Sequence, residues 1–198
     1  MPLEDIIALA IFAFVSSITP GPNNLMLLSS GASFGMRRTF PHMMGVALGF
    51  GAMIAALGAG LAELYSSLPW ANLVLKIAGS LYLFWLAVKI ATSRPDWDST
   101  SSSSRPFRFW EAVAFQWVNP KAWSMALTAL AVYASGGQIG VVLAVALIFM
   151  AINLPCIAAW VGMGSGMARV LSDPLKLRRI NYVLAGLLIL SILPMLRV

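Results

Sequence analysis

Hydrophobic residues fill six long stretches of the chain, and polar residues gather between them. A helix needs about 20 apolar residues to cross the hydrocarbon core of a bilayer, and each stretch is long enough or nearly so. The pattern therefore predicts an all-α, polytopic membrane protein with six transmembrane helices. We expect these helices over Leu3–Phe34, Thr39–Glu63, Leu68–Thr92, Phe109–Ala134, Ile139–Gly162 and Ile180–Leu196.

The first and fourth stretches are each interrupted by prolines and polar residues, over Thr19–Asn24 and Asn119–Lys121. A proline inside a helix donates no hydrogen bond and frees a carbonyl one turn earlier. Such groups are tolerated in a membrane only where they are buried in protein or line a polar cavity. We predict that both helices are broken about 15 Å from the cytoplasmic face, and restart at Leu25 and near Lys121.

A serine-rich segment, "DWDSTSSSSRP", divides the chain into two halves of three predicted helices each. We read one membrane domain, 1–198, made of a repeat over 1–95, a flexible cytoplasmic linker over 96–106 and a second repeat over 107–198. Because three is odd, the halves enter the membrane in opposite directions. In transporters built this way, paired interruptions rich in glycine and proline point to the binding site.

Candidate binding residues lie at the two breaks and at polar positions within the helices. The positive end of a half-helix and Lys121 suit a carboxylate, and amides with freed carbonyls suit an ammonium group. Other readings stay open: the prolines as simple kinks, the amides as caps for freed backbone groups, Lys76 reaching the outer interface, and Asn153 as part of a kink. The predicted substrate-binding set is Pro20, Gly21, Pro22, Asn23, Asn24, Lys76, Gln116, Asn119, Pro120, Lys121 and Asn153.

Composition supports the membrane interpretation, because 60% of the residues are hydrophobic and 10% are charged, with a mean hydropathy of +0.85. A soluble domain carries roughly 25% charged residues. The net charge of +6 comes mostly from basic residues in alternate loops. The positive-inside rule places these loops in the cytoplasm and both termini outside, so the charge indicates topology and no nucleic-acid partner.

The sequence offers little for catalysis or metal binding. It has one histidine and one cysteine, and we find no carboxylate pair within the predicted helices. We therefore expect no enzyme, no catalytic residue, no metal and no cofactor. The leading interpretation is a secondary transporter for a small zwitterionic amino acid, whose halves rock about the site. Exporters of basic amino acids or inorganic cations, and a non-transporting structural subunit, are the alternatives.

Three stretches resemble the LysE/RhtB family of bacterial amino-acid exporters: "ITPGPNNLMLLSSGASFGMRR", "LKIAGSLYLFWLAVKI" and "FQWVNPKAWSMAL". The resemblance implies an exporter of small amino acids in the bacterial inner membrane. "LFWLAVKIATS" and "FWEAVAFQWVN" are similar to the branch that exports cysteine and O-acetylserine. Many members have glycine where this chain has Ala87, so packing of the third helix can differ. A coupling proton and a homodimer stay open.

Overall fold

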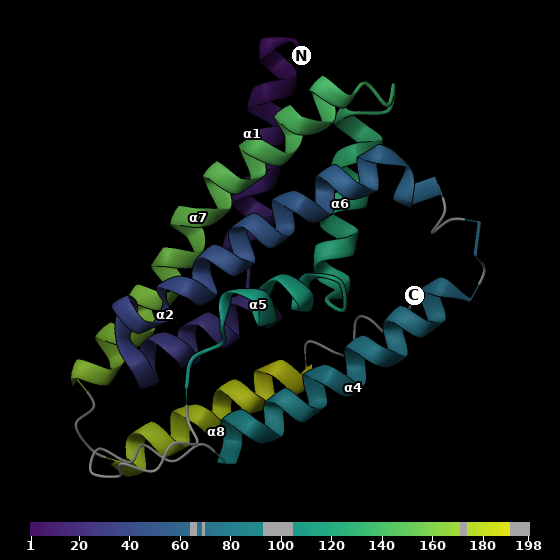
Figure 1. Ribbon diagram of the computed structural model, residues 1–198. Coiled ribbons are helices and arrows are strands. Elements are labelled where there is room, and N and C mark those ends of the chain that lie inside the picture. The colour runs from purple at the N-terminus through teal and green to yellow at the C-terminus, as the bar shows by residue number, and fades with distance from the viewer. Residues whose placement is uncertain (64–66, 69, 93–104, 171–173, 191–198) are drawn as a thin grey trace.

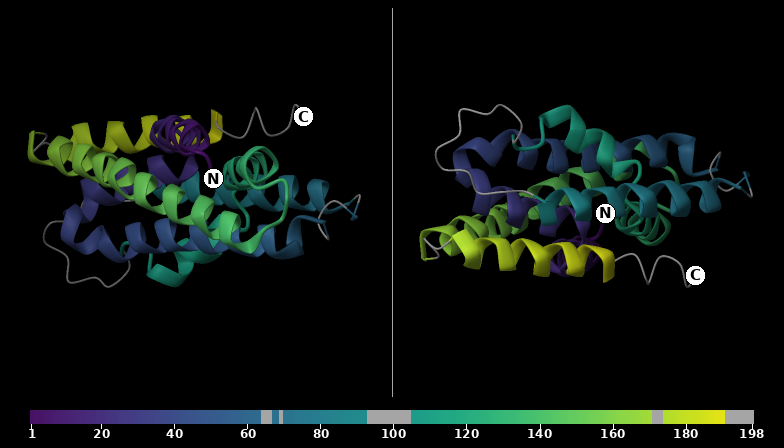
Figure 2. Two further views of the ribbon diagram at one scale, coloured as in Figure 1. Left: turned by 90° about the horizontal axis from the view of Figure 1, so that it is seen from above. Right: turned by 90° about the horizontal axis from the view of Figure 1, so that it is seen from below.

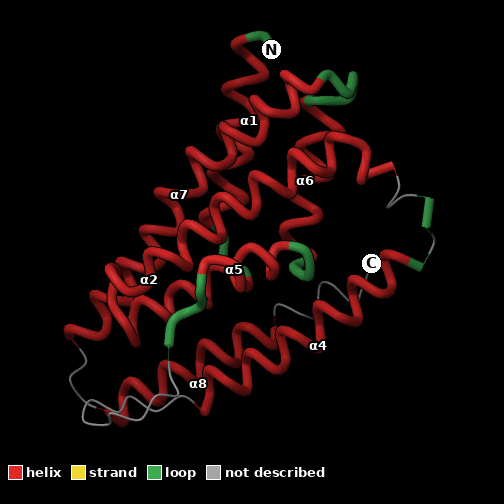
Figure 3. The backbone as a smooth tube through the Cα atoms, viewed as in Figure 1, coloured by secondary structure: helices red, strands yellow, loops and turns green. Residues whose placement is uncertain are grey.

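The structure is a computed structural model that describes residues 1–63, 67–68, 70–92, 105–170 and 174–190. This part of the chain forms helices joined by short loops and contains no strand (Figure 3), which confirms the predicted all-α fold. In chain order the elements are α1 (Leu3–Ile18), α2 (Pro22–Ala56), the π-helical turn η1 (Leu57–Leu61), α4 (Ala71–Thr92), α5 (Phe109–Gln116), α6 (Pro120–Tyr133), α7 (Ile139–Val170) and α8 (Pro174–Leu190).

Both predicted helix breaks are present, between α1 and α2 and between α5 and α6. Thr19 and Gly21 are extended in the first break, with ψ of 143° and 176°. Asn119 is extended in the second, with ψ of 103°. Each of the three precedes a proline, whose ring clashes with a helical conformation of the residue before it. The prolines therefore end one helix and begin the next.

The first helix restart comes earlier than the sequence predicts. We expected the first restart at Leu25, but α2 begins at Pro22, so Asn23 and Asn24 lie in its first turn. α6 also begins at a proline, Pro120, which agrees with the predicted restart near Lys121. Proline suits the first position of a helix, because its fixed φ is already helical and the amide hydrogen it lacks has no partner there.

The interruption predicted after Phe34, between the first and second transmembrane stretches, is present as a sharp turn at Gly35, with φ 75° and ψ 170°. The helix resumes directly after this turn, so the interruption is shorter than the predicted loop of residues 35–38. Glycine adopts a positive φ at little cost because it has no Cβ. α2 therefore has two arms, residues 22–34 and 36–56, which run in different directions (Figure 1).

The predicted ends of the last two stretches are also wrong. α7 continues past Gly162 to Val170, and α8 begins at Pro174 instead of Ile180. Hydropathy marks where apolar residues end, whereas these helices continue into more polar sequence. α7 also runs without interruption through Pro155. Residues 93–104, with most of the predicted linker, and 191–198 lie outside the described residues.

α2 forms the centre of the helix packing, with its most extensive contacts to α7 and further contacts to α5. α4 and α8 lie alongside each other (Figure 1, and the right view of Figure 2). The first arm of α2 crosses α7 at two glycines: a Cβ on Gly31 would lie 2.3 Å from the carbonyl oxygen of Val161, and one on Gly164 would lie 2.0 Å from that of Leu28. Small residues permit such close crossings between membrane helices.

The outer faces of the described helices are apolar. Large hydrophobic side chains are exposed along α1, α4, α7 and α8, as expected for helices that face lipid. By length and composition, two segments can cross a membrane: Pro22–Leu61, with mean hydropathy 1.9, and Ile139–Met167, with mean hydropathy 2.6. Six spans, the inverted relation of the halves and the orientation in the membrane stay predictions.

Candidate functional site

The first break leaves the carbonyl groups at the end of α1 without helical partners, as every helix end does. Side chains take over this role. Asn24 Nδ2 donates to the carbonyl oxygens of Ser17 and Thr19, both at 2.8 Å. Trp160 Nε1 on α7 donates to the carbonyl oxygen of Ile18 at 3.2 Å. Both amide hydrogens of Asn24 are thus engaged with the protein, as the capping interpretation of this residue predicts.

The second break is capped from within its own half. The Asn119 side chain accepts a hydrogen bond from the backbone N–H of Lys121 at 3.2 Å, the usual role of asparagine at a helix N-cap. The indole of Trp123 donates to the carbonyl oxygen of Trp117 at 3.0 Å. The Asn119 amide nitrogen is left over from this arrangement, and it belongs to a residue that lines a pocket.

The two breaks touch, although about 100 residues separate them in the sequence. Lys121 Nζ donates to the carbonyl oxygen of Thr19 at 2.8 Å, to its hydroxyl at 3.0 Å and to the carbonyl oxygen of Pro20 at 3.4 Å. The amides of Asn23 and Gln116 pair with each other at 2.9 and 3.3 Å. Because a charge within a membrane segment is costly without partners, the carbonyls of the first half stabilise the ammonium group of the second.

Gly21 gives Lys121 room to reach the first break. A Cβ at this position would lie 2.8 Å from Cδ and 3.0 Å from Nζ of Lys121. Gly21 is also the N-cap of α2, and no side chain among the described residues caps that helix end. The ammonium group of Lys121 therefore lies beside the positive end of the α2 dipole, where an anionic group is favoured.

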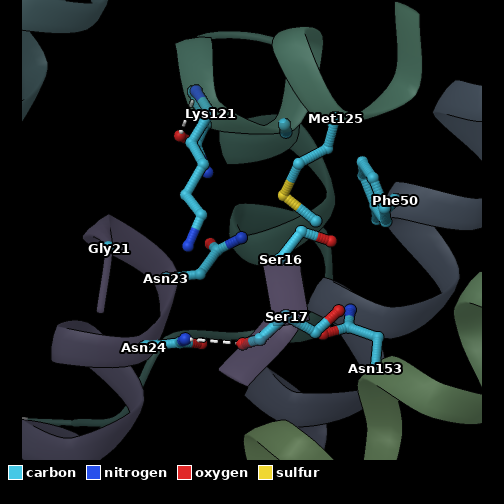
Figure 4. Close-up of a pocket in the computed structure, with 11 residues that line it drawn as sticks. Ser16, Ser17, Gly21, Asn23, Asn24, Phe50, Lys121, Met125 and Asn153 are labelled. Atoms are coloured by element: carbon cyan, nitrogen blue, oxygen red, sulfur yellow. Dashed lines mark hydrogen bonds between the residues drawn. The ribbon is translucent and has the colours of Figure 1, made fainter. Parts of the chain in front are cut away.

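A pocket of about 350 Å³, its open mouth included, lies at the meeting of the breaks. Figure 4 shows Lys121 at one end, Ser17 and Asn153 at the other, and Phe50 with Met125 along a third side. The lining residues are Ser16, Ser17, Gly21, Asn23, Asn24, Phe50, Asn119, Lys121, Ala122, Met125 and Asn153.

The model of one protein family, described as LysE type translocator, matches residues 14–193. The chain belongs to this family. The match confirms the resemblance noted in the sequence, and a translocator family supports a transporter rather than an enzyme. It also supports the membrane interpretation of the helices.

Several curated relatives carry the name "Cysteine/O-acetylserine efflux protein". The proteins from Escherichia coli K12, Shigella flexneri serotype 5b and Shigella sonnei are each 37% identical over 123 residues. The match covers 62% of this chain and 62% of each relative. No solved structure matches the chain significantly.

The structure brings six of the predicted binding residues to the pocket of this LysE family member: Gly21, Asn23, Asn24, Asn119, Lys121 and Asn153. The three prolines form the breaks behind it, and the buried Gln116 supports Asn23. The side chain of Lys76 lies outside the described part of the structure. Whether any of these residues contacts substrate stays a prediction.

Sequence reasoning missed five lining residues: Ser16, Ser17, Phe50, Ala122 and Met125. The two serines directly precede the first break, so their place in the sequence could have identified them. Phe50 and Met125 gave no such signal, because an apolar side chain that faces a pocket looks the same in the sequence as one in the core.

Proposed function

We propose that this protein exports a small neutral amino acid or amino-acid derivative, of the cysteine and O-acetylserine type, across the bacterial inner membrane. The proposal rests on the contact between the two helix breaks. This contact places a lysine, amide groups and a small pocket between two halves of a LysE family chain. The name of the curated relatives supports the substrate class.

The carboxylate of the substrate binds at Lys121 in this proposal. Its ammonium group and the uncapped start of α2 both attract an anion. The apolar side of the pocket, formed by Phe50, Ala122 and Met125, receives a short side chain. A methionine thioether is polarizable and adapts to small ligands, which fits a thiol or an ester.

Two alternatives predict a different pocket. An exporter of basic amino acids or inorganic cations calls for acidic side chains around the ligand, whereas the charged side chain that lines this pocket is that of Lys121. A structural subunit needs no polar pocket between broken helices. The electrostatics therefore favour a zwitterion, whose carboxylate complements the lysine.

Alternating access follows if the halves move about the breaks. Lys121 belongs to the second half and its carbonyl partners to the first, so relative movement of the halves changes the surroundings of its ammonium group. A proton gradient is the coupling source to be tested first, and a homodimer is the oligomeric state to be tested. The positive-inside rule supports basic loops in the cytoplasm and termini in the periplasm.

Efflux from proteoliposomes tests the proposal. Purified protein is reconstituted with labelled cysteine, O-acetylserine, threonine, leucine or lysine inside, with and without a pH gradient. We expect faster release of cysteine or O-acetylserine than of lysine. Lys121→Gln is expected to slow release by about 10-fold or more, the effect of losing a hydrogen bond to a charged group.

Ser124→Ala is the matched control, since Ser124 is exposed on the same helix, α6, and does not line the pocket. Preferred release of lysine would contradict the neutral substrate. If Lys121→Gln and Ser124→Ala both transport like the wild type, the site is wrong although the export activity stands. If folded wild-type protein releases none of the five, amino-acid export itself is wrong.

A further inference from the structure

Two neighbouring serines at the end of α1 differ in how their hydroxyl groups are satisfied. Ser16 Oγ donates to the carbonyl oxygen of Phe12 at 2.6 Å, the usual bond of a serine to its own helix. Ser17 Oγ has no hydrogen-bond partner among the described residues, although Ser17 is only 4% exposed. A buried hydroxyl without a partner is costly, and this one belongs to a residue that lines the pocket.

Asn153 on α7 lies opposite Ser17. It is 6% exposed, and Figure 4 shows the two side chains pointing toward one another at the end of the pocket away from Lys121. No hydrogen bond joins the Asn153 amide to another described side chain or backbone group. Two buried polar groups from different helices therefore point toward one another at the pocket and lack partners among the described residues.

Asn24 adds an oxygen to this part of the pocket. Its two amide hydrogens are engaged by the carbonyl oxygens of Ser17 and Thr19. This arrangement leaves the side-chain oxygen Oδ1 as the group that Asn24 can offer to a ligand, and it fixes which way the amide is turned. Ser17 Oγ, the Asn153 amide and Asn24 Oδ1 together supply three hydrogen-bond acceptors.

We propose that Ser17, Asn153 and Asn24 Oδ1 bind the α-ammonium group of the transported amino acid, an assignment that rests on the proposed function. An ammonium group carries three N–H donors, each of which needs an acceptor where water is excluded. The apolar side of the pocket cannot supply them, and Lys121 repels a cation. The three acceptors match the ammonium group in number and in chemistry.

In this assignment the pocket contacts the carboxylate, the ammonium group and the side chain of an α-amino acid. The carboxylate faces Lys121, the ammonium group faces Ser17 and Asn153, and the side chain faces Phe50 and Met125. The pocket then accepts O-acyl derivatives, because acylation there alters only the side chain. It binds N-acyl and des-amino analogues more weakly than the parent amino acids, because these analogues lack the ammonium donors and leave the buried acceptors unpaired.

Equilibrium binding to purified protein in lipid nanodiscs tests the assignment. The probes are L-cysteine, which carries all three groups, and 3-mercaptopropionate, which lacks the amino group. We expect Ser17→Ala to weaken L-cysteine binding by about 10- to 100-fold, the effect of a hydrogen bond to a charged group. Binding of 3-mercaptopropionate is expected to stay the same in this variant.

Ser124→Ala provides the matched control, because Ser124 is exposed on α6 and does not line the pocket. L-cysteine binding in this variant should stay within about twofold of the wild type. Ser17→Thr keeps the hydroxyl and should restore most of the affinity. Because Ser17 Oγ has no partner among the described residues, Ser17→Ala should not lower the unfolding temperature, so lost binding would not reflect lost folding.

The outcomes separate this assignment from the proposed function. Equal weakening of L-cysteine and 3-mercaptopropionate by Ser17→Ala would overturn the ammonium assignment. So would unchanged L-cysteine binding in that variant while Lys121→Gln still weakens it, and in both cases amino-acid binding would stand. If the folded wild type binds neither L-cysteine nor O-acetylserine, the proposed substrate class falls, and the ammonium subsite with it.

Discussion

Replacing Gly21 by alanine should act through Lys121 and not through the local backbone. The extended conformation at Gly21, with φ −177° and ψ 176°, is open to any residue. The added Cβ, however, would lie 2.8 Å from Lys121 Cδ. An ordinary contact begins near 3.4 Å, so the lysine side chain must retreat by about 0.6 Å or more.

That shift is enough to break hydrogen bonds. Lys121 Nζ lies 2.8 Å from the carbonyl oxygen of Thr19 and 3.0 Å from its hydroxyl, and N–H···O bonds beyond about 3.2 Å weaken quickly. Loss of one hydrogen bond from a charged donor costs about 1.5–3 kcal/mol. Replacing glycine also stabilises the protein by about 0.4–1 kcal/mol, because the unfolded chain loses conformational freedom. We expect a net destabilisation of about 1–2 kcal/mol.

A second substitution reverses the sign. In a Lys121→Ala background the side chain that collides with the new methyl group is absent, so Gly21→Ala keeps only the gain of about 0.4–1 kcal/mol from the unfolded state. Unfolding of the four proteins in nanodiscs gives the interaction energy between the two sites as a double-mutant cycle. We expect Gly21→Ala to lower the unfolding temperature of the wild type and to raise that of Lys121→Ala.

Gly140→Ala on α7 is the control, because a Cβ there meets nothing within 4 Å. It should leave stability and transport close to the wild type. Additive effects of Gly21→Ala and Lys121→Ala would refute the reasoning, since they would mean that the alanine at position 21 does not act through the lysine. A stable Gly21→Ala protein with unimpaired efflux would refute it as well.

Two further predictions concern packing. Gly164→Ala should destabilise the protein by several kcal/mol, because its Cβ would lie 2.0 Å from the backbone oxygen of Leu28. Gly166→Ala is the control: its Cβ meets nothing within 4 Å, so the protein should tolerate it. Thermal unfolding of both variants tests this prediction. His42→Phe should leave stability unchanged or raise it in the same assay, because both ring nitrogens of this buried residue lack partners among the described groups and phenylalanine keeps the stacking on Phe107.

The sequence was a good guide wherever proline determines the backbone. Thr19, Gly21 and Asn119 each precede a proline, and this local clash places both breaks within a few residues. The interruption after Phe34 was predicted, but not its form as a turn at the single residue Gly35, because glycine is common in membrane helices and nothing nearby shows which glycine adopts a positive φ. The ends of α7 and α8 were missed because hydropathy reports apolar length and not helix length.

The candidate site was predictable in its polar members but not in their partners. Lys121 and the asparagines stand out because polar groups are rare in these apolar stretches. That Lys121 binds the carbonyls of Thr19 and Pro20, and that Asn23 pairs with Gln116, depends on how two distant halves pack. Such long-range contacts cannot be predicted from the local sequence. The sequence therefore did not show which amides support the breaks and which face the pocket.

Substrate binding at Lys121 competes with the hydrogen bonds by which this lysine joins the two halves. The three N–H donors of Lys121 all face oxygen atoms of the first break. A carboxylate that binds Lys121, as proposed, must therefore replace at least one of them, most readily the Pro20 carbonyl at 3.4 Å. A ligand shifts a conformational equilibrium only by its difference in affinity for the two states. The displaced carbonyls provide such a difference, because a carboxylate binds more tightly in any conformation where they have already separated from Lys121.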